Sequence, residues 1–405
     1  MSENKDHKLV SLSYLILLFS KVGSISFGGF MALVAVLKKE VVDKDKNLKD
    51  HVLLDGISLA SLLPGPVAVN VVGYVGNYLR GFWGAIMSMA AVIFPSFILV
   101  LGFSIFYFKF GSVDTFQAVV GYLIPAIIII ILTVGINMSR KQLKTWPQFV
   151  IGLISIILFQ WIGGIMITVG VIFAGGLLGY FLYYKKSENS SVTTTLKIGL
   201  PKELLVGISS ILLLLGGCFV LMYTFGGEAY FKVNSQLFLT FSSMSLSLFG
   251  GGYVFIPIIQ ETVVNQLHWL TSSEFNTAIA ISQITPGPIL ISATFIGYKV
   301  AGVIGAITAT IGIFLPSGLV MIALSGYLKQ ISGSQQLKAI FKGLRPAIIG
   351  LIFSAGITIF RQSNLNVTFL IIFAITFILA LKYKLSTIWV MLISIGLGIL
   401  AEFII

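Results

Sequence analysis

Long apolar runs separated by short polar loops make up most of this chain. A helix that crosses a bilayer needs about 20 predominantly apolar residues, and most of the runs approach or exceed that length. They predict spans at Leu9–Leu37, Phe82–Phe108, Thr115–Met138, Pro147–Gln160, Gly163–Tyr184, Leu204–Tyr223, Asn234–Val264, Gly302–Leu328, Leu337–Phe360, Val367–Leu381 and Ser386–Ile405. Two further apolar segments, 51–79 and 273–300, each contain a Pro-Gly-Pro sequence, so we expect about 11–13 spans in all.

The composition identifies the solvent of this fold. Of the 405 residues, 57% are hydrophobic and only 10% are charged, whereas soluble domains carry roughly 25% charged residues. A soluble fold of this size could not bury that much apolar surface. We therefore expect an all-α polytopic protein of the plasma membrane. Its polar N-terminus, with no small-residue cleavage site after the first apolar run, predicts a retained span rather than a cleaved signal peptide.

The net charge of +12 does not indicate a nucleic-acid partner. Lys and Arg lie mostly in short loops, where the positive-inside bias of membrane proteins accounts for them. His7, His51 and His268 show no metal-ligand spacing, and the sequence contains no phosphate loop or nucleophile–base set. We expect a protein that is not an enzyme and that uses no metal or cofactor.

The two halves of the chain repeat each other. Pro64-Gly65-Pro66 recurs as Pro286-Gly287-Pro288, and Phe27-Gly28-Gly29 recurs at the same spacing as Phe249-Gly250-Gly251. After a slip of one position, a constant spacing also pairs Pro95-Ser96 with Pro316-Ser317 and Arg140 with Arg361. We predict an N-terminal repeat (1–184), a polar linker with a connector helix (185–233) and a C-terminal repeat (234–405).

The orientation of the halves depends on whether the Pro-Gly-Pro segments cross the membrane. If they cross, each half has six spans and the connector helix makes the repeats inverted. If they re-enter instead, each half crosses five times and the repeats are parallel. Both schemes place the same excess of Lys and Arg on the cytoplasmic side, so charge does not decide. We favour inverted repeats, because inverted halves with broken helices are a recurring transporter plan.

The Pro-Gly-Pro sequences are the first candidate for chemistry. Proline lacks a backbone donor and clashes with the preceding turn, so two prolines around a glycine end a helix. In hydrocarbon, the freed backbone groups must face protein or a water-filled cavity. A second half-helix that begins at Pro66 or Pro288 would point its free N–H groups and positive dipole end at the membrane midplane. That geometry predicts an anion site, whereas a simple packing kink is the alternative.

The Phe-Gly-Gly elements are the second candidate. Gly28, Gly29, Gly250 and Gly251 either let helices approach closely or mark another unwound point. Each element precedes a Pro-Gly-Pro break in its own half. We therefore expect the two kinds of element to face each other and to contribute to one site.

Polar and charged residues at membrane depth complete the predicted site. Lys21 lies within the first span and Arg345 lies beside Pro346, and both are candidates to bind an anion, with snorkelling to the interface as the alternative. Asn70 and Gln283 offer neutral hydrogen-bond donors near the two breaks. Donors and cations outnumber carboxylates, which favours an anion over a metal cation.

Few acids are available for proton coupling. Asp55 and Glu261 lie at the ends of apolar segments and are the candidates for a titratable group, with a solvated helix cap as the alternative.

These motifs resemble the chromate ion transporter family in its long form, which is built from two homologous domains. The resemblance is carried by both Phe-Gly-Gly and both Pro-Gly-Pro elements, by LTSSEF at Leu270–Phe275 and by SATFIGYKVAGVIGAITATIGIFLPS at Ser292–Ser317. The sequence departs from some members, which have Pro after Phe-Gly-Gly and Asn with an acid after Pro-Gly-Pro. Here Phe30 or Gly252 and Val67 or Ile289 follow instead, and these positions bear on substrate and coupling.

The resemblance implies efflux of chromate across the plasma membrane, driven by the proton-motive force and antagonised by sulfate. It also implies halves of opposite orientation. A sulfate-like oxyanion importer and an uncoupled anion channel stay open as alternatives, and a homodimer is one expected assembly.

Overall fold

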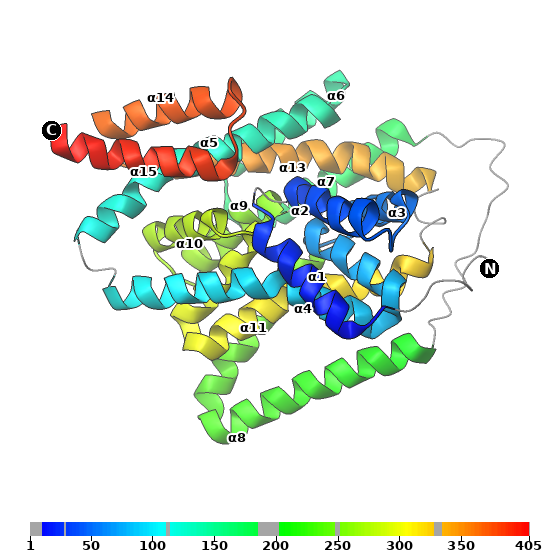
Figure 1. Cartoon of the computed structure of the whole chain (residues 1–405). Coiled ribbons are helices and arrows are strands. Elements are labelled where there is room, and N and C mark those ends of the chain that lie inside the picture. Colours follow the sequence, from blue (N-terminus) through cyan, green and yellow to red (C-terminus); the bar gives the residue numbers. More distant parts are fainter. Residues whose placement is uncertain are drawn as a thin grey trace. The chain divides into compact units, whose positions relative to one another are not determined.

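The computed structural model describes residues 10–27, 30–110, 114–184, 202–247, 252–327 and 334–404, and Figure 1 shows that these are helical or lie in the connections between helices. The described residues contain no strand. The polar linker falls outside them. The expectation of an all-α fold is confirmed.

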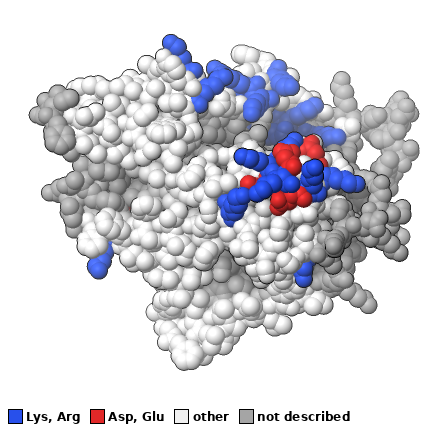
Figure 2. Space-filling model, in the orientation of Figure 1, with Lys and Arg blue, Asp and Glu red and all other residues white. Residues whose placement is uncertain are grey.

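Six described helical segments are long and apolar enough to cross a membrane: Val67–Phe110, Gly121–Gln142, Met166–Tyr183, Leu205–Ser247, Ile289–Tyr327 and Gln335–Gln362. Four shorter apolar helices, at Leu12–Ile25, Trp146–Trp161, Val367–Leu381 and Thr387–Ala401, add to these within the same part of the chain. Figure 2 shows that most of the visible surface carries neither basic nor acidic side chains, as a surface in contact with lipid requires.

The chain folds into two compact units, and each unit takes segments from both sequence halves. Unit 1 comprises residues 1–101, 189–251 and 286–333. Its elements are α1 (Leu12–Ile25), α2 (Phe30–Leu37), η1 (Lys38–Lys44), α3 (Asp50–Ala60), most of α4 (Val67–Phe110), α8 (Lys202–Ser247), η4 (Ile289–Ile291), α11 (Ser292–Leu324) and η5 (Ser325–Tyr327). Helices α8 and α11 pack along each other, and Gly312 of α11 lies against Phe238 and Phe241 of α8.

Unit 2 comprises residues 102–188, 252–285 and 334–405. Its elements are the end of α4, α5 (Asp114–Gln142), α6 (Trp146–Trp161), α7 (Gly164–Tyr183), η2 (Gly252–Val254), α9 (Phe255–Gln260), η3 (Glu261–Gln266), α10 (Ser272–Ile284), α13 (Gln335–Gln362), α14 (Val367–Leu381) and α15 (Thr387–Ile404). Helix α13 packs on α5, α6 and α7, while α5 packs on α14 and α15. Because α14 and α15 are the repeat equivalents of α6 and α7, each half supplies the partners of the other.

Backbone geometry repeats with the sequence. Lys46 and His268, which are repeat equivalents, both have positive φ, at 52° and 51°. Helices α4 and α11 carry the same kink, where Gly81 and Gly302 have φ of 65° and 62°. The first of these kinks lies between the predicted segments that end at residue 79 and begin at residue 82. The duplication read from Gly and Pro positions is therefore also a duplication of backbone conformation.

One predicted span is wrong as a continuous helix. The span predicted at Leu9–Leu37 is broken, because α1 ends at Ile25 and α2 begins at Phe30. In the span predicted at Asn234–Val264, α8 extends to Ser247 and η2 begins at Gly252, with residues 248–251 outside the described part of the chain. Helix α8 also joins the connector helix to the second repeat through a kink at Gly227. Hydrophobicity alone does not reveal the interruption at Ser26 and Phe27, because the residues on both sides of it are mostly apolar.

Candidate substrate-binding site

The two Pro-Gly-Pro turns have the same backbone conformation. Gly65 has φ of +98° and Gly287 has φ of +105°, a region in which glycine carries no steric penalty from a Cβ atom. Pro66 and Pro288 each come directly before a helical segment rather than being its first residue. Pro288 has extended ψ of 138°, and the Pro66 carbonyl accepts the N–H of Asn70 at 3.0 Å. The predicted helix starts are thus corrected by one residue, to Val67 and Ile289.

Each turn is seated against the Pro-Ser element of the opposite half. A Cβ atom on Gly65 would overlap the side chain of Ser317, and one on Gly287 would overlap the hydroxyl of Ser96. The Ser96 hydroxyl donates a hydrogen bond to the Pro286 carbonyl. Since Pro95-Ser96 and Pro316-Ser317 are repeat equivalents, the two turns are held by reciprocal contacts within unit 1.

The ends of the first helices also meet the turns. The Gly287 N–H donates to the carbonyl of Ser26, the residue directly after α1, at 2.8 Å. A Cβ on Gly65 would lie 3.3 Å from the carbonyl of Ser245, near the end of α8. Helices α1 and the last part of α8 are repeat equivalents. A Phe-Gly-Gly element therefore begins next to the Pro-Gly-Pro turn of the other half, although Gly28, Gly29, Gly250 and Gly251 lie outside the described residues.

Buried polar groups without partners mark the start of both half-helices. Asn70 and Ser292, which are repeat equivalents, are 0% and 1% exposed. The Asn70 amide donates to the Pro64 carbonyl at 3.0 Å, but its Oδ1 has no partner among the described residues. The Ser292 hydroxyl has none there either. An unsatisfied buried polar group costs about 1–3 kcal/mol, so a bound ligand or water at these positions would be stabilising.

The first turn of α4 adds backbone donors to this set. The first N–H groups of a helix have no partner within the helix, and Val67, Ala68 and Val69 are all buried. Backbone N–H groups at a helix N-terminus favour an anion. The Asn70 oxygen accepts hydrogen bonds, so it suits a water molecule or a protonated oxygen of the bound ion.

Lys21 and Arg345, the two predicted cations, lie in different units. The Lys21 ammonium is paired with Glu40 at 2.6 Å, and its side chain is 48% exposed. Arg345 lies on α13, half-buried, with its guanidinium 5.7 Å from the centre of the Phe341 ring. No carboxylate of the described residues is within ion-pair distance of Arg345. Arg345 is thus a cation without a charged partner in the part of the chain that the structure describes.

Gln283 is buried in the last turn of α10, three residues before Pro286. Its Oε1 accepts a hydrogen bond from the Tyr253 hydroxyl at 3.3 Å, and its Nε2 has no partner in the described ranges. Tyr253 follows the second Phe-Gly-Gly element after a single glycine. Within unit 2, Gln283 thus brings a free buried donor to the segment that leads into the second break.

The two predicted acids have different surroundings. Asp55 is half-buried on α3. Glu261 begins η3 and lines a cavity of about 270 Å³ in unit 2, where its carboxylate accepts from Asn265 at 2.7 Å and Gln266 at 3.4 Å. Arg361 lines the same cavity and donates to Gln160 at 3.0 Å. Sequence reasoning missed this cavity, because its polar side chains come from separate segments of the chain.

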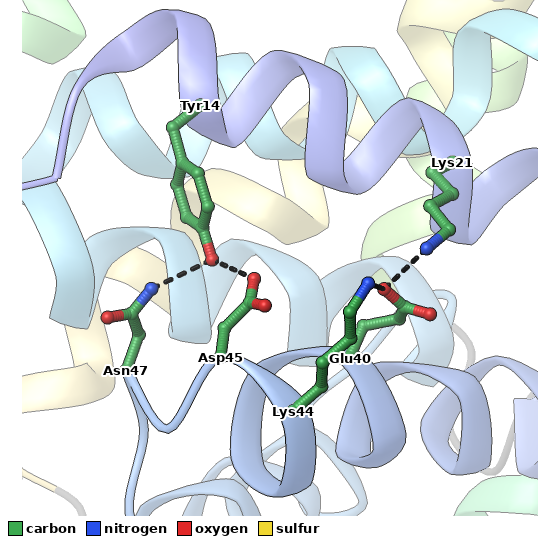
Figure 3. A network of polar contacts seen from close by, with 6 residues as sticks. All are labelled: Tyr14, Lys21, Glu40, Lys44, Asp45 and Asn47. Atoms are coloured by element: carbon green, nitrogen blue, oxygen red, sulfur yellow. Dashed lines mark hydrogen bonds and ion pairs between the residues drawn. The ribbon is translucent and has the colours of Figure 1, made fainter.

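Sequence reasoning noted Glu40 only as an acid at the end of an apolar segment and preferred Asp55 and Glu261, whereas Glu40 is the acid that is buried in the described residues. Figure 3 shows its carboxylate between Lys21 of α1 and Lys44, which lies 3.5 Å away. The hydrogen bond from Lys21 lowers the pKa of Glu40, because a nearby cation stabilises the charged form. The signal in the sequence was an acid directly after an apolar run, among several lysines, but its pairing with Lys21 of α1 could not be predicted from that pattern.

The same network continues along α1. The Tyr14 hydroxyl donates a hydrogen bond to Asp45 and accepts one of 2.8 Å from the Asn47 amide (Figure 3).

No group of three or more His, Cys, Asp or Glu side chains that could hold a metal ion occurs in the described residues.

The chain was compared with known proteins. The family model described as "Chromate transporter" matches residues 13–180 and 235–399. An uncharacterized transporter of Methanocaldococcus jannaschii is 31% identical over 94% of this chain and 92% of its own length. A chromate transport protein of Cupriavidus metallidurans is 28% identical, covering 92% and 89%, and a probable chromate transport protein of Synechococcus elongatus is 27% identical, covering 88% and 86%.

No solved structure matches this chain. The family match covers both halves, and members of this family are membrane-embedded transporters rather than enzymes. The apolar helices agree with that placement. This chain belongs to the chromate transporter family.

Proposed function

We propose that this protein exports chromate, a tetrahedral oxyanion, across the plasma membrane and that the proton-motive force drives the export. The observation that carries the proposal is the pair of reciprocally seated Pro-Gly-Pro turns, each followed by a buried polar side chain without a partner in the described residues, Asn70 or Ser292. Membership of the chromate transporter family supports the substrate class.

The proposed site uses the chain at the two breaks. Each break, Pro64–Pro66 or Pro286–Pro288, ends one helix and precedes the first turn of the next. The N–H groups of that turn have no partner within the helix, so together with the positive helix end they attract the anion. Asn70, Gln283 and the Phe-Gly-Gly glycines complete the uncharged part of the site. Lys21 and Arg345 supply positive charge. Alternating access then follows from movement of the elements around the two breaks.

Chromate flux in proteoliposomes with a controlled pH gradient tests the proposal. We expect saturable chromate uptake into inverted vesicles, dependent on the proton-motive force and inhibited by a protonophore. Flux that a protonophore leaves unchanged would favour the uncoupled channel. Sulfate uptake in right-side-out vesicles, in excess of chromate flux, would favour the sulfate-like importer.

Sulfate is the necessary competitor in that assay. Chromate and sulfate share charge and tetrahedral shape, so amide, hydroxyl and backbone donors bind both. The inverted orientation of the repeats, the proton-coupling roles of Asp55 and Glu261, and a homodimer remain predictions. Absence of any anion flux from the wild-type protein would refute transport by this chain.

A further inference from the structure

The ion pair of Lys21 and Glu40 has a feature that a surface salt bridge lacks. Glu40 is 7% exposed, and it is the buried acid among the side chains that the structure describes. Its Oε2 lies 2.6 Å from Lys21 and 3.5 Å from Lys44. A buried charge is expensive unless it is paired, so the ionised state of this carboxylate depends on its lysine partners.

Two other carboxylates of this region, Asp45 and Asp50, have partners of their own. On α1, Tyr14 is bound to Asp45, and Asp45 is held within hydrogen-bond reach of that hydroxyl rather than of Glu40. From α3, Asp50 pairs with Lys38 at 2.7 Å, and both of those side chains are about half exposed. Lys21 is therefore the cation from a neighbouring helix that balances Glu40.

Lys21 also lies near the end of α1, and the residue directly after α1 contacts the second break. It precedes Ser26 by five residues, which corresponds to about 7.5 Å along a helix at about 1.5 Å per residue. The Ser26 carbonyl accepts the N–H of Gly287 at 2.8 Å. Lys21 thus lies on the helix whose end contacts the second break, and its ammonium is occupied by the protein's own carboxylate (Figure 3).

We propose that the transported oxyanion and Glu40 compete for Lys21, and that Glu40 takes up one proton from water when the anion displaces it. The inference rests on the proposed function. When an anion neutralises Lys21, the buried carboxylate loses the nearer of its two lysine partners, Lys44 remains 3.5 Å away, and protonation becomes more favourable. By linkage, protonation of Glu40 strengthens anion binding at Lys21 by the same factor. One proton is bound per anion, and no covalent bond to the substrate forms or breaks.

This coupling fixes the direction in which the proton moves. Proton and anion cross together, since the protonated carboxyl accompanies the anion-bound state. A dianion with one proton keeps one net negative charge. An inside-negative membrane potential favours outward movement of that charge by about 2.3 kcal/mol per 100 mV. The membrane potential, rather than the pH gradient, is then the part of the proton-motive force that drives export.

The test measures chromate and protons together in proteoliposomes that contain the whole chain and an internal pH dye. In the wild type, a chromate gradient should carry protons in the same direction as chromate. In Glu40→Gln, which keeps the size of the side chain, we expect the protons moved per chromate to fall at least tenfold. The half-saturating chromate concentration should also fall, because the competitor has lost its charge.

Asp50→Asn is the matched control, since it removes an exposed carboxylate that is paired with a lysine of η1. It should leave the ratio of protons to chromate unchanged. An undiminished ratio in Glu40→Gln, or protons that move against chromate in the wild type, would overturn the inference while leaving chromate transport intact.

Lys21→Gln gives an independent measurement. We expect the half-saturating chromate concentration to rise about tenfold and the protons moved per chromate to fall at least tenfold, because no ammonium remains for the anion and Glu40 to compete for. If this ion pair only joins α1 to η1, Lys21→Gln would lower thermal stability and leave both quantities unchanged in the inserted protein. That result refutes the competition even if Glu40→Gln does not insert.

Discussion

The first and second Pro-Gly-Pro breaks share a backbone but differ in the groups around it. Gly65 and Gly287 have nearly the same φ, and each lies against a serine of the opposite half. Asn70 lies in the first turn of the first half-helix, and Ser292 takes its place in the second. Ser96 donates to the carbonyl of the break that it contacts, whereas Ser317 donates within its own helix, to Phe314 at 3.4 Å.

Charge differs between the halves even more. At the spacing that pairs the two Pro-Gly-Pro turns, Lys21 corresponds to Ser243 and Glu40 corresponds to Thr262, so the ion pair has no equivalent in the second half. The backbone that holds the breaks is thus duplicated, while these titratable groups are not. This difference teaches that both halves supply the frame of a site, whereas the proton chemistry that we propose belongs to one half.

Loss of the shared backbone should have the largest effect. Gly65→Ala or Gly287→Ala places a side chain at positive φ, which costs about 1–3 kcal/mol, and adds overlap with a serine. We expect chromate transport to be abolished and the melting temperature to fall. Gly170→Ala is the control, because its Cβ would meet nothing within 4 Å.

A second change tests the reciprocal seating directly. Ser96→Gly in the Gly287→Ala background removes the overlap and should recover part of the melting temperature. Ser317→Gly in the same background should recover none. Equal recovery by both would contradict the pairing of each break with the opposite half.

Proline and arginine substitutions come next. Pro288→Ala lets the helix continue through the break, and Arg345→Ala removes a cation without a charged partner in the described residues. We expect each to abolish chromate tolerance in cells while membrane insertion, measured by fractionation, stays intact. Full tolerance in both variants would remove the anion site at the breaks from consideration.

The difference between Asn70 and Ser292 should appear as a smaller change in affinity. Asn70→Ala removes an amide that also supports the Pro64 carbonyl, so the half-saturating chromate concentration should rise about tenfold, equivalent to about 1.4 kcal/mol. Ser292→Ala should raise the half-saturating concentration less, since the Ser292 hydroxyl, unlike the Asn70 amide, does not also hold a carbonyl of the turn. A larger rise in the half-saturating concentration for Ser292→Ala than for Asn70→Ala would make Ser292, rather than Asn70, the main side-chain contact of the anion.

The smallest effect concerns the two serines. Ser96→Ala removes a buried hydrogen bond across the halves and should lower the free energy of unfolding by about 1 kcal/mol. Ser317→Ala removes only a weak bond within its own helix and should change it by a few tenths. Thermal unfolding in detergent measures the stability of both variants. Equal changes in the free energy of unfolding would mean that Ser96 and Ser317 stabilise their breaks equally.

Much of this architecture follows from the sequence alone. Apolar runs determine the membrane and the helices, because a helix in lipid must satisfy its own backbone groups. The spacing of Gly and Pro determines the duplication and the position of both breaks, since these residues control backbone conformation locally. The motifs at those positions also determine the family.

Tertiary structure decided what depends on residues far apart in the chain. The seating of Gly65 on Ser317 and of Gly287 on Ser96 joins helices from opposite halves, and no local pattern encodes which helices become neighbours. The interruption after Ile25 joins the first Phe-Gly-Gly element to the second Pro-Gly-Pro turn, and the sequence had left close packing and an unwound point both open there. The pairing of Lys21 with Glu40 arose where the chain turns back between α1 and η1, because a buried carboxylate requires a cation that only folding brings to it.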